Sequence, residues 1–123
     1  MLKSLFLAGF GGFIGTCIRF LVNKLFPNYF SGAFPWPTFI VNILGCFIFG
    51  IILGWLNKTG NIESKIYPLL ITGFCGGLTT FSTFSNELFT LSFQREWIIF
   101  GLYLFLSIFF GILLAWLGKL LMQ

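Results

Sequence analysis

The stretch GFCGGLTTFSTFSNE occupies residues 73–87 of a 123-residue chain. It contains three glycines, several hydroxyl side chains, a glutamate, and the phenylalanines Phe81 and Phe84 three residues apart. Apolar runs flank it on both sides, IYPLLIT before it and LFTLSF after it. Ionisable and polar groups in such surroundings are costly in lipid and usually serve a function. The function of the protein is therefore expected to lie in this stretch.

The composition of the chain is that of a membrane protein. It is 58% hydrophobic and only 8% charged, whereas soluble domains carry about 25% charged residues. A soluble chain of this length has too little interior to hide so much apolar surface. The length indicates a single domain. The basic residues give a net charge of +4 but are scattered, which favours anchors at helix ends over a nucleic-acid-binding patch.

The residue types that enzymes use most often are scarce. The chain has no histidine, and its cysteines Cys17, Cys46 and Cys75 fall in separate apolar segments without a CxxC pair. We interpret them as small buried hydrophobes. No nucleophile–base pair or metal-ligating cluster is visible, so we predict that the protein is not an enzyme.

Four apolar segments are long enough to cross a membrane as helices, which takes about 20 residues each. They lie at about 2–25, 38–56, 66–93 and 97–117. We expect an all-α membrane protein with one domain over residues 1–123 and four transmembrane helices. The first segment has no small-residue cleavage pattern and is interpreted as a retained helix.

The charges at the segment ends leave the orientation open. With both termini on one side, that side carries four lysines and the other side carries two basic residues. The first group is Lys3, Lys58, Lys65 and Lys119, and the second is Lys24 and Arg95. Such a weak bias is compatible with termini inside or with dual topology, which would build an antiparallel homodimer. A pathway inside one bundle would need polar residues from all four helices, but the fourth segment contributes only Tyr103 and Ser107. A pathway at a subunit interface is therefore the better hypothesis.

The sequence GGLTT at 76–80 has two interpretations. Its glycines can form a close helix–helix contact face. Alternatively, the helix is broken here, which membranes tolerate only where the backbone is buried in protein or lines a cavity. Carbonyls freed by a break can coordinate a small cation.

Polar residues from 79 to 90 follow helical spacing and form one stripe. The stripe consists of Thr79, Ser82, Thr83, Asn86 and Thr90, provided that the helix already includes residue 79. Glu87 lies at its edge, and Phe81 and Phe84 lie on another face. The stripe predicts a water or ion track. The alternative for its hydroxyls is that they bond back to their own helix, and the alternative for Glu87 is that it lies near the interface and is solvated. Aromatic rings have a positive edge, so the two phenylalanines can form an anion-favouring constriction.

Two polar residues on the first two helices complete the set. Arg19 either snorkels to the interface or supplies positive potential at a mouth. Asn42 either donates hydrogen bonds to an anion or bonds a neighbouring helix. Thr38 lies one turn from Asn42 and is expected to share its pore-facing side.

The chain resembles the Fluc (CrcB) family of fluoride channels. Three blocks carry the resemblance: GGFIGTCIRF at 11–20, PTFIVNILGCFIFG at 37–50, and GFCGGLTTFSTFSNE at 73–87. The third block is long and specific, and the resemblance covers essentially the whole chain.

The resemblance implies an antiparallel, dual-topology homodimer in the bacterial inner membrane, with two fluoride pores and a third helix broken near its middle. It implies that Phe81 and Phe84 face fluoride with their edges, that Asn42 donates hydrogen bonds, and that Arg19 sits at a vestibule. It implies a polar track made of Ser82, Thr83, Glu87, Tyr103 and Ser107. It also implies a central, untransported sodium ion held by the backbone carbonyls of Gly76 and Thr79 from both subunits. Fluoride, membrane lipid and a second copy are the expected partners, without nucleic acid or a soluble protein.

Two other functions stay open on the residues alone. One is a small proton-coupled multidrug exporter, in which Glu87 would carry the coupling. The other is an assembly subunit without transport activity.

Overall fold

The computed structural model describes residues 1–26, 33–60 and 65–122, and nearly all of them are helical. The helices, in chain order, are α1 (Leu2–Leu25), α2 (Trp36–Thr59), the π-helical segment η1 (Pro68–Cys75), α3 (Gly76–Leu78), α4 (Phe81–Phe93) and α5 (Trp97–Leu121). No strand occurs within these residues. The all-α prediction is confirmed.

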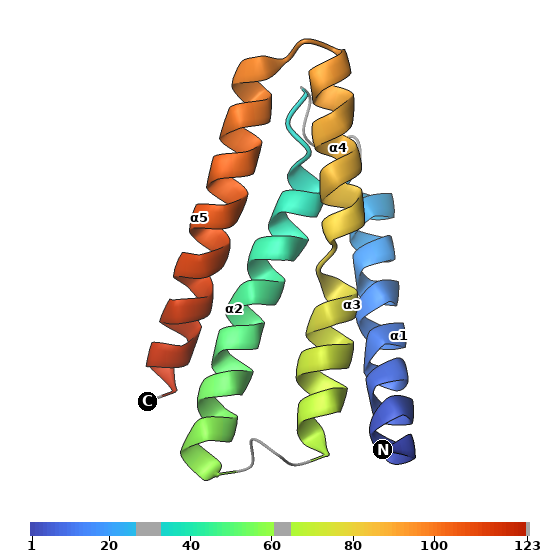
Figure 1. Cartoon of the computed structure of the whole chain (residues 1–123), viewed down its shortest axis with the longest axis vertical. Helices are drawn as coiled ribbons and strands as arrows, with labels where there is room; N and C mark the ends of the chain where they lie inside the picture. Colours follow the sequence, from blue (N-terminus) through green and yellow to red (C-terminus); the bar gives the residue numbers. More distant parts are fainter. Residues whose placement is uncertain (27–32, 61–64, 123) are drawn as a thin grey trace.

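Three of the helices described by the structure, α1, α2 and α5, are long and apolar enough to span a membrane. At 24, 24 and 25 residues, they reach about 36 Å at 1.5 Å per residue, against a hydrocarbon core of about 30 Å. The segments η1, α3 and α4 follow one another along the same general direction (Figure 1). The chain is a multi-pass membrane protein.

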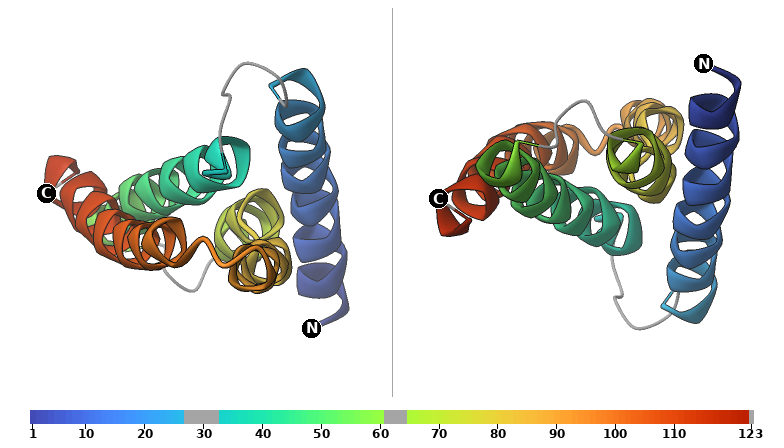
Figure 2. Two further views of the ribbon diagram at one scale, coloured as in Figure 1. Left: turned by 90° about the horizontal axis from the view of Figure 1, so that it is seen from above. Right: turned by 90° about the horizontal axis from the view of Figure 1, so that it is seen from below.

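The helices form two groups around η1, α3 and α4. Helix α2 packs mainly on α5, and α1 packs on η1 and α3. In both end views, η1 to α4 lie between α1 on one side and the α2–α5 pair on the other (Figure 2). Helix α1 begins at the end of the bundle where α5 finishes (Figure 1). The third segment therefore contacts both groups, which puts residues 73–87 at the centre of the subunit.

Helix α2 is longer than the predicted 38–56 at both ends. It begins at Trp36, and Pro37 lies in its first turn, where a missing N–H costs no intrahelical hydrogen bond. It ends at Thr59 and is capped by Gly60, whose φ of 73° is left-handed and whose N–H donates to the carbonyl of Asn57. Helix α5 likewise runs four residues beyond the predicted 97–117.

Glycines join α1 to η1 and α3. A Cβ on Gly15 would lie 2.7 Å from the backbone nitrogen of Leu78, and a Cβ on Gly77 would lie 3.0 Å from the Cα of Gly12. A Cβ on Gly73 would likewise lie 3.0 Å from the Cα of Gly11, and a Cβ on Gly11 would lie 2.9 Å from the backbone nitrogen of Phe74. Without a hydrophobic driving force between helices in lipid, such backbone-to-backbone contact is a main source of packing energy.

We expect Gly15→Val to destabilise the protein while Gly9→Val has little effect. The valine would collide with backbone, which has no rotamer to change, whereas a Cβ on Gly9 meets nothing within 4 Å. Overpacking costs about 1–3 kcal/mol even where side chains can adjust. Thermal unfolding of both purified variants in detergent measures the difference. Equal melting temperatures for the two variants would show that the seam between α1 and η1–α3 does not hold the fold.

Candidate functional site

The helix through residues 68–93 is interrupted by two extended residues. Thr79 has φ −87° and ψ 158°, and Thr80 has φ −148° and ψ 127°. Gly76 is still helical, with φ −64° and ψ −34°. Gly77 packs closely on α1, as in the first interpretation above, and the extended residues are the two threonines after Leu78. We call Thr79 and Thr80 the break.

Thr80 begins α4 as its N-cap. Its Oγ1 accepts a hydrogen bond from the N–H of Thr83 at 3.2 Å, which satisfies one of the unpaired donors at a helix start. Its hydroxyl also lies 3.3 Å from the Ser82 Oγ. Thr80 was missed by the sequence reasoning, although a threonine immediately before the first residue of a helix is a recognisable N-cap signal.

Asn42 on α2 pairs with both backbone groups of Thr80. The N–H of Thr80 donates to Asn42 Oδ1 at 2.8 Å, and Asn42 Nδ2 donates to the carbonyl of Thr80 at 3.2 Å. The side-chain amide thus acts like a neighbouring peptide in a strand pair. Asn42 therefore bonds a neighbouring segment, as in the second interpretation given above. The second N–H of its amide is not used in any hydrogen bond that the described residues form.

On the other side of the break, Arg19 reaches from α1. Its Nε donates to the carbonyl of Gly77 at 2.9 Å. Arg19 is half-buried and does not line the cavity described below. The structure therefore separates Arg19 from the other predicted site residues.

Two backbone carbonyls at the break lack their ordinary helical donors. In a continuous α-helix, the carbonyls of Gly76 and Thr79 would accept from the N–H groups of Thr80 and Thr83. The first N–H donates instead to Asn42 and the second to the Thr80 hydroxyl. Carbonyls of unwound helices coordinate small cations in membrane proteins, so these two oxygens fit sodium in kind. Two ligands from one chain do not complete a coordination shell.

The predicted polar stripe is partly wrong. Thr79 belongs to the break and precedes α4, and its Oγ1 donates to the carbonyl of Cys75 at 2.9 Å. It therefore does not share a helix face with Ser82, Thr83, Asn86 and Thr90, which all lie on α4. Thr90 also bonds back, to the carbonyl of Asn86 at 2.9 Å. The stripe that starts on α4 is shorter than predicted because the break shifts the helical phase.

A cavity of about 250 Å³ opens beside the break. Its lining comes from α2, the break, α4 and α5, and consists of Asn42, Cys46, Thr79, Thr80, Phe81, Phe84, Ser107 and Ile108. The Ser107 hydroxyl is buried and forms no hydrogen bond with the part of the chain that the structure describes. The cavity thus gathers predicted site residues from three helices, together with Cys46, which we had expected only to fill space.

The two phenylalanines of the site differ in their surroundings. Their ring centroids are 6.3 Å apart at an interplanar angle of 50°. Phe84 is 8% exposed and packs edge-to-face on Tyr103 at 4.9 Å, whereas Phe81 is 78% exposed. Phe84 is therefore part of the core between α4 and α5, and Phe81 projects from it.

A second group of polar residues lies beyond Phe84. The Tyr103 hydroxyl donates to Glu87 Oε1 at 3.0 Å, and Tyr103 is fully buried. Thr38, also fully buried, lies beside both, although its hydroxyl forms no hydrogen bond of good geometry with the described residues. Glu87 is thus paired within the protein, contrary to the alternative in which it is merely solvated.

The polar group at the cavity and the polar group around Glu87 are separated by one helical turn, both on α2 and on α5. Thr38 precedes Asn42 by four residues on α2, and Tyr103 precedes Ser107 by four on α5, which places each pair on one face. Phe84 lies between the groups, since it lines the cavity and contacts Tyr103. The result is a line of polar side chains that passes the edge of the aromatic core.

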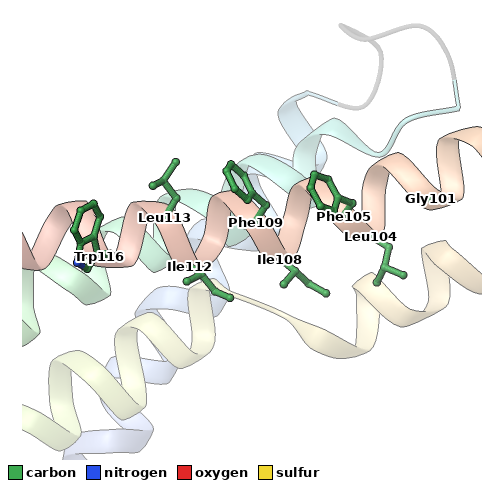
Figure 3. Close-up of a pocket in the computed structure, with 8 residues that line it drawn as sticks. All are labelled: Gly101, Leu104, Phe105, Ile108, Phe109, Ile112, Leu113 and Trp116. Carbon is green, nitrogen blue, oxygen red and sulfur yellow. The ribbon is translucent and has the colours of Figure 1, made fainter.

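A larger cavity lies elsewhere. It has a volume of about 600 Å³ and runs along α5, where its lining from Gly101 to Trp116 is entirely apolar (Figure 3). Such a lining offers an ion no hydrogen-bond donors and suits lipid chains or another apolar surface. The candidate functional site is therefore the smaller, polar cavity at the break.

Known proteins are similar to this chain over nearly its whole length. Residues 6–119 match the family model described as "CrcB-like protein, Camphor Resistance (CrcB)". The chain is 42% identical over 123 residues to the "Fluoride-specific ion channel FluC" of Azobacteroides pseudotrichonymphae, covering 100% of this chain and 98% of that protein. It is 38% identical over 117 residues to the protein of that name in Flavobacterium psychrophilum, covering 95% and 94%.

A relative from an archaeon shows the same extent of similarity. The "Fluoride-specific ion channel FluC" of Methanococcus maripaludis is 39% identical over 119 residues, covering 97% of this chain and 95% of that protein. The matches include all three blocks that carry the resemblance, because they span nearly the whole chain. The chain belongs to the CrcB family.

Proposed function

We propose that this protein is a fluoride-selective ion channel that lets cytoplasmic fluoride leave the cell passively. One observation carries the proposal: polar side chains from α2 and α5 form a continuous line past Phe84. The line begins at the cavity with Asn42 and Ser107 and continues to Tyr103 and Glu87. The relatives that match over their whole length are named as fluoride-specific channels. The family is one of channels, so an enzymatic activity is not proposed.

The chemistry of the line suits a small anion. Fluoride is compact and accepts hydrogen bonds strongly, so it needs donors that replace its water. The unused N–H of Asn42 and the Ser107 hydroxyl provide donors at the cavity, and Thr38 and Tyr103 provide hydroxyls beyond Phe84. Ser82 and Thr83 on α4 would extend the track. Positive ring edges of Phe81 and Phe84 would pass the ion between donors without rehydrating it. Chloride is too large for such a closely spaced track.

A second copy of the chain would complete the site. The break exposes backbone at membrane depth, and lipid cannot satisfy backbone groups. Phe81, which lines the cavity, is 78% exposed, so the open side of the cavity faces out of the subunit. A homodimer with two-fold symmetry would bury both breaks against each other and create two equivalent pores.

An antiparallel arrangement of the two copies fits the weak charge bias. The described ends of the helices carry basic residues at both faces of the membrane, including Lys58 and Lys119 at one end and Lys24 and Arg95 at the other. Orientation follows the lysine and arginine bias of the loops. With so small a difference, the same chain would insert both ways into the inner membrane and pair with its inverted copy.

A sodium ion at the centre of the dimer would be held by backbone oxygen. The freed carbonyls of Gly76 and Thr79 supply two ligands per chain, and two chains supply four. When bound, the ion would neutralise carbonyl dipoles that face each other across the two-fold axis. Asn42 supports this site because it keeps the Thr80 N–H away from the Gly76 carbonyl.

Reconstitution tests the proposal most directly. We expect purified protein in liposomes loaded with fluoride to release it rapidly, as followed with a fluoride electrode, while chloride is retained in a parallel assay. The release should not depend on a proton gradient, and Glu87→Gln should create no such dependence. Release that requires a proton gradient and is abolished in Glu87→Gln would identify an exporter instead. No release from a folded dimer would leave the assembly subunit.

A further inference from the structure

We propose that Arg19 is a positioning residue that keeps the third helix broken by holding the carbonyl of Gly77. This assigns Arg19 a role at the back of the break through a hydrogen bond, and not through positive potential at a mouth. The hydrogen bond from its Nε to the Gly77 carbonyl is 2.9 Å long and joins residues 58 positions apart. Its consequence for conduction rests on the proposed channel function, but its consequence for the backbone does not.

The glycine contacts explain why Arg19 can reach this carbonyl. Gly12 and Gly15 on α1 lie against the backbone of Gly77 and Leu78, so the two backbones are as close as they can be. Arg19 is one turn beyond Gly15. Long side chains on a helix point back toward its N-terminus, which directs the guanidinium toward the level of Gly15 and so toward Gly77.

The bond matters because it competes with closure of the helix. In a continuous helix, the Gly77 carbonyl would accept from the N–H of Phe81, the first residue of α4. With Arg19 on that carbonyl, and with Asn42 on the N–H of Thr80, two successive helical hydrogen bonds across the break are replaced by side chains. The arginine thereby favours the extended conformation in which the carbonyls of Gly76 and Thr79 are exposed.

The charge of Arg19 is also well placed for this role. The segments η1 and α3 form one helical run that ends at Leu78, and a helix carries partial negative charge at its C-terminus. A cation beside the last turn stabilises that end. A snorkelling arginine would instead extend its nitrogens toward water, and the donation from Nε to a half-buried backbone carbonyl is inconsistent with that posture.

Two conservative substitutions separate the hydrogen bond from the charge. In Arg19→Gln, the amide nitrogen occupies the same place along the side chain as the arginine Nε, so the donor is kept and the charge is lost. In Arg19→Lys, a methylene occupies that place, so the charge is kept and the donor is moved. Lys24→Gln serves as the control, because Lys24 is an exposed cation on the same helix whose ammonium lies over the Phe20 ring.

Hydrogen–deuterium exchange of the purified, full-length protein measures the protection of the backbone amides at the break, independently of ion flux. Because closure of the helix would give these amides helical hydrogen bonds, we expect amides at 76–84 to exchange at least about tenfold slower in Arg19→Lys, within about threefold of wild type in Arg19→Gln, and unchanged in Lys24→Gln. Fluoride efflux should follow the same order. Exchange that is unchanged in both Arg19 variants, or faster in Arg19→Lys than in Arg19→Gln, would overturn the proposal.

The same data separate the two proposals. If the exchange order holds but wild-type liposomes release no fluoride, the positioning role stands and the channel function fails. If wild-type liposomes release fluoride and Arg19→Lys conducts normally while Arg19→Gln does not, the charge of Arg19 is what matters and the positioning role fails.

Discussion

Phe81→Ile is expected to slow fluoride efflux at least about tenfold, the change that follows from raising the barrier by roughly 1.4 kcal/mol. Isoleucine preserves apolar bulk but has no aromatic edge with which to attract an anion. Because Phe81 is 78% exposed in the subunit, its replacement removes little packing within the chain. The loss should therefore appear in transport and not in the stability of the subunit.

Phe93→Ile is the matched control for this prediction. Phe93 is on the same helix and is 74% exposed, but it is twelve residues from Phe81 and outside the cavity. The measurement is electrode-recorded efflux from liposomes that contain equal amounts of folded dimer. Wild-type efflux in Phe81→Ile, or equal losses in the two variants, would remove Phe81 from the permeation pathway.

Asn42→Leu is expected to have the second large effect, on both stability and transport. Leucine has nearly the same shape but cannot pair with the N–H and carbonyl of Thr80. Each buried backbone group left unpaired costs about 1–3 kcal/mol, so a total of about 2–6 kcal/mol is at stake. The break would either close into helix or lose its order, and efflux would stop in both cases.

Two further variants make the Asn42 result interpretable. Asn57→Leu, at the exposed C-terminal end of the same helix, should change neither the melting temperature nor efflux. Asn42→Asp keeps an acceptor for the Thr80 N–H but loses the amide donor and adds a negative charge. It should retain much of the fold and lose efflux. If Asn42→Leu melts like wild type, the side chain does not hold the break.

The number and order of the helices were largely predictable, because they depend on local patterns. Segments 2–25 and 97–117 are continuous apolar runs, and such runs identify membrane helices by length and composition alone. The polar residues of 79–87 stood out for the same reason, since hydroxyls and a glutamate are rare in lipid. Thr38 with Asn42 and Tyr103 with Ser107 were placed on common faces by their spacing of four.

The details of the break were less predictable. The glycines at 76 and 77 were natural candidates for unwinding, yet both stay helical, Gly77 packs on α1, and the extended residues are Thr79 and Thr80. Glycine permits both close packing and unusual backbone conformations, so its presence does not distinguish them. The choice depends on Asn42, which lies 38 residues away in sequence and offers Thr80 both hydrogen bonds that an extended residue needs.

Arg19 shows the same limit most clearly. Its position within an apolar segment identified it as unusual, but snorkelling, potential at a mouth and a bond to another helix all satisfy the same local pattern. Its partner became apparent only when α1 was placed against α3, through glycine contacts on both helices. Helix number, order and apolar faces come from short-range periodicity in the chain. The hydrogen-bond partners of Arg19, Asn42 and Glu87 come from which helices lie side by side, and no local pattern encodes that, because each of these side chains bonds a residue on another helix.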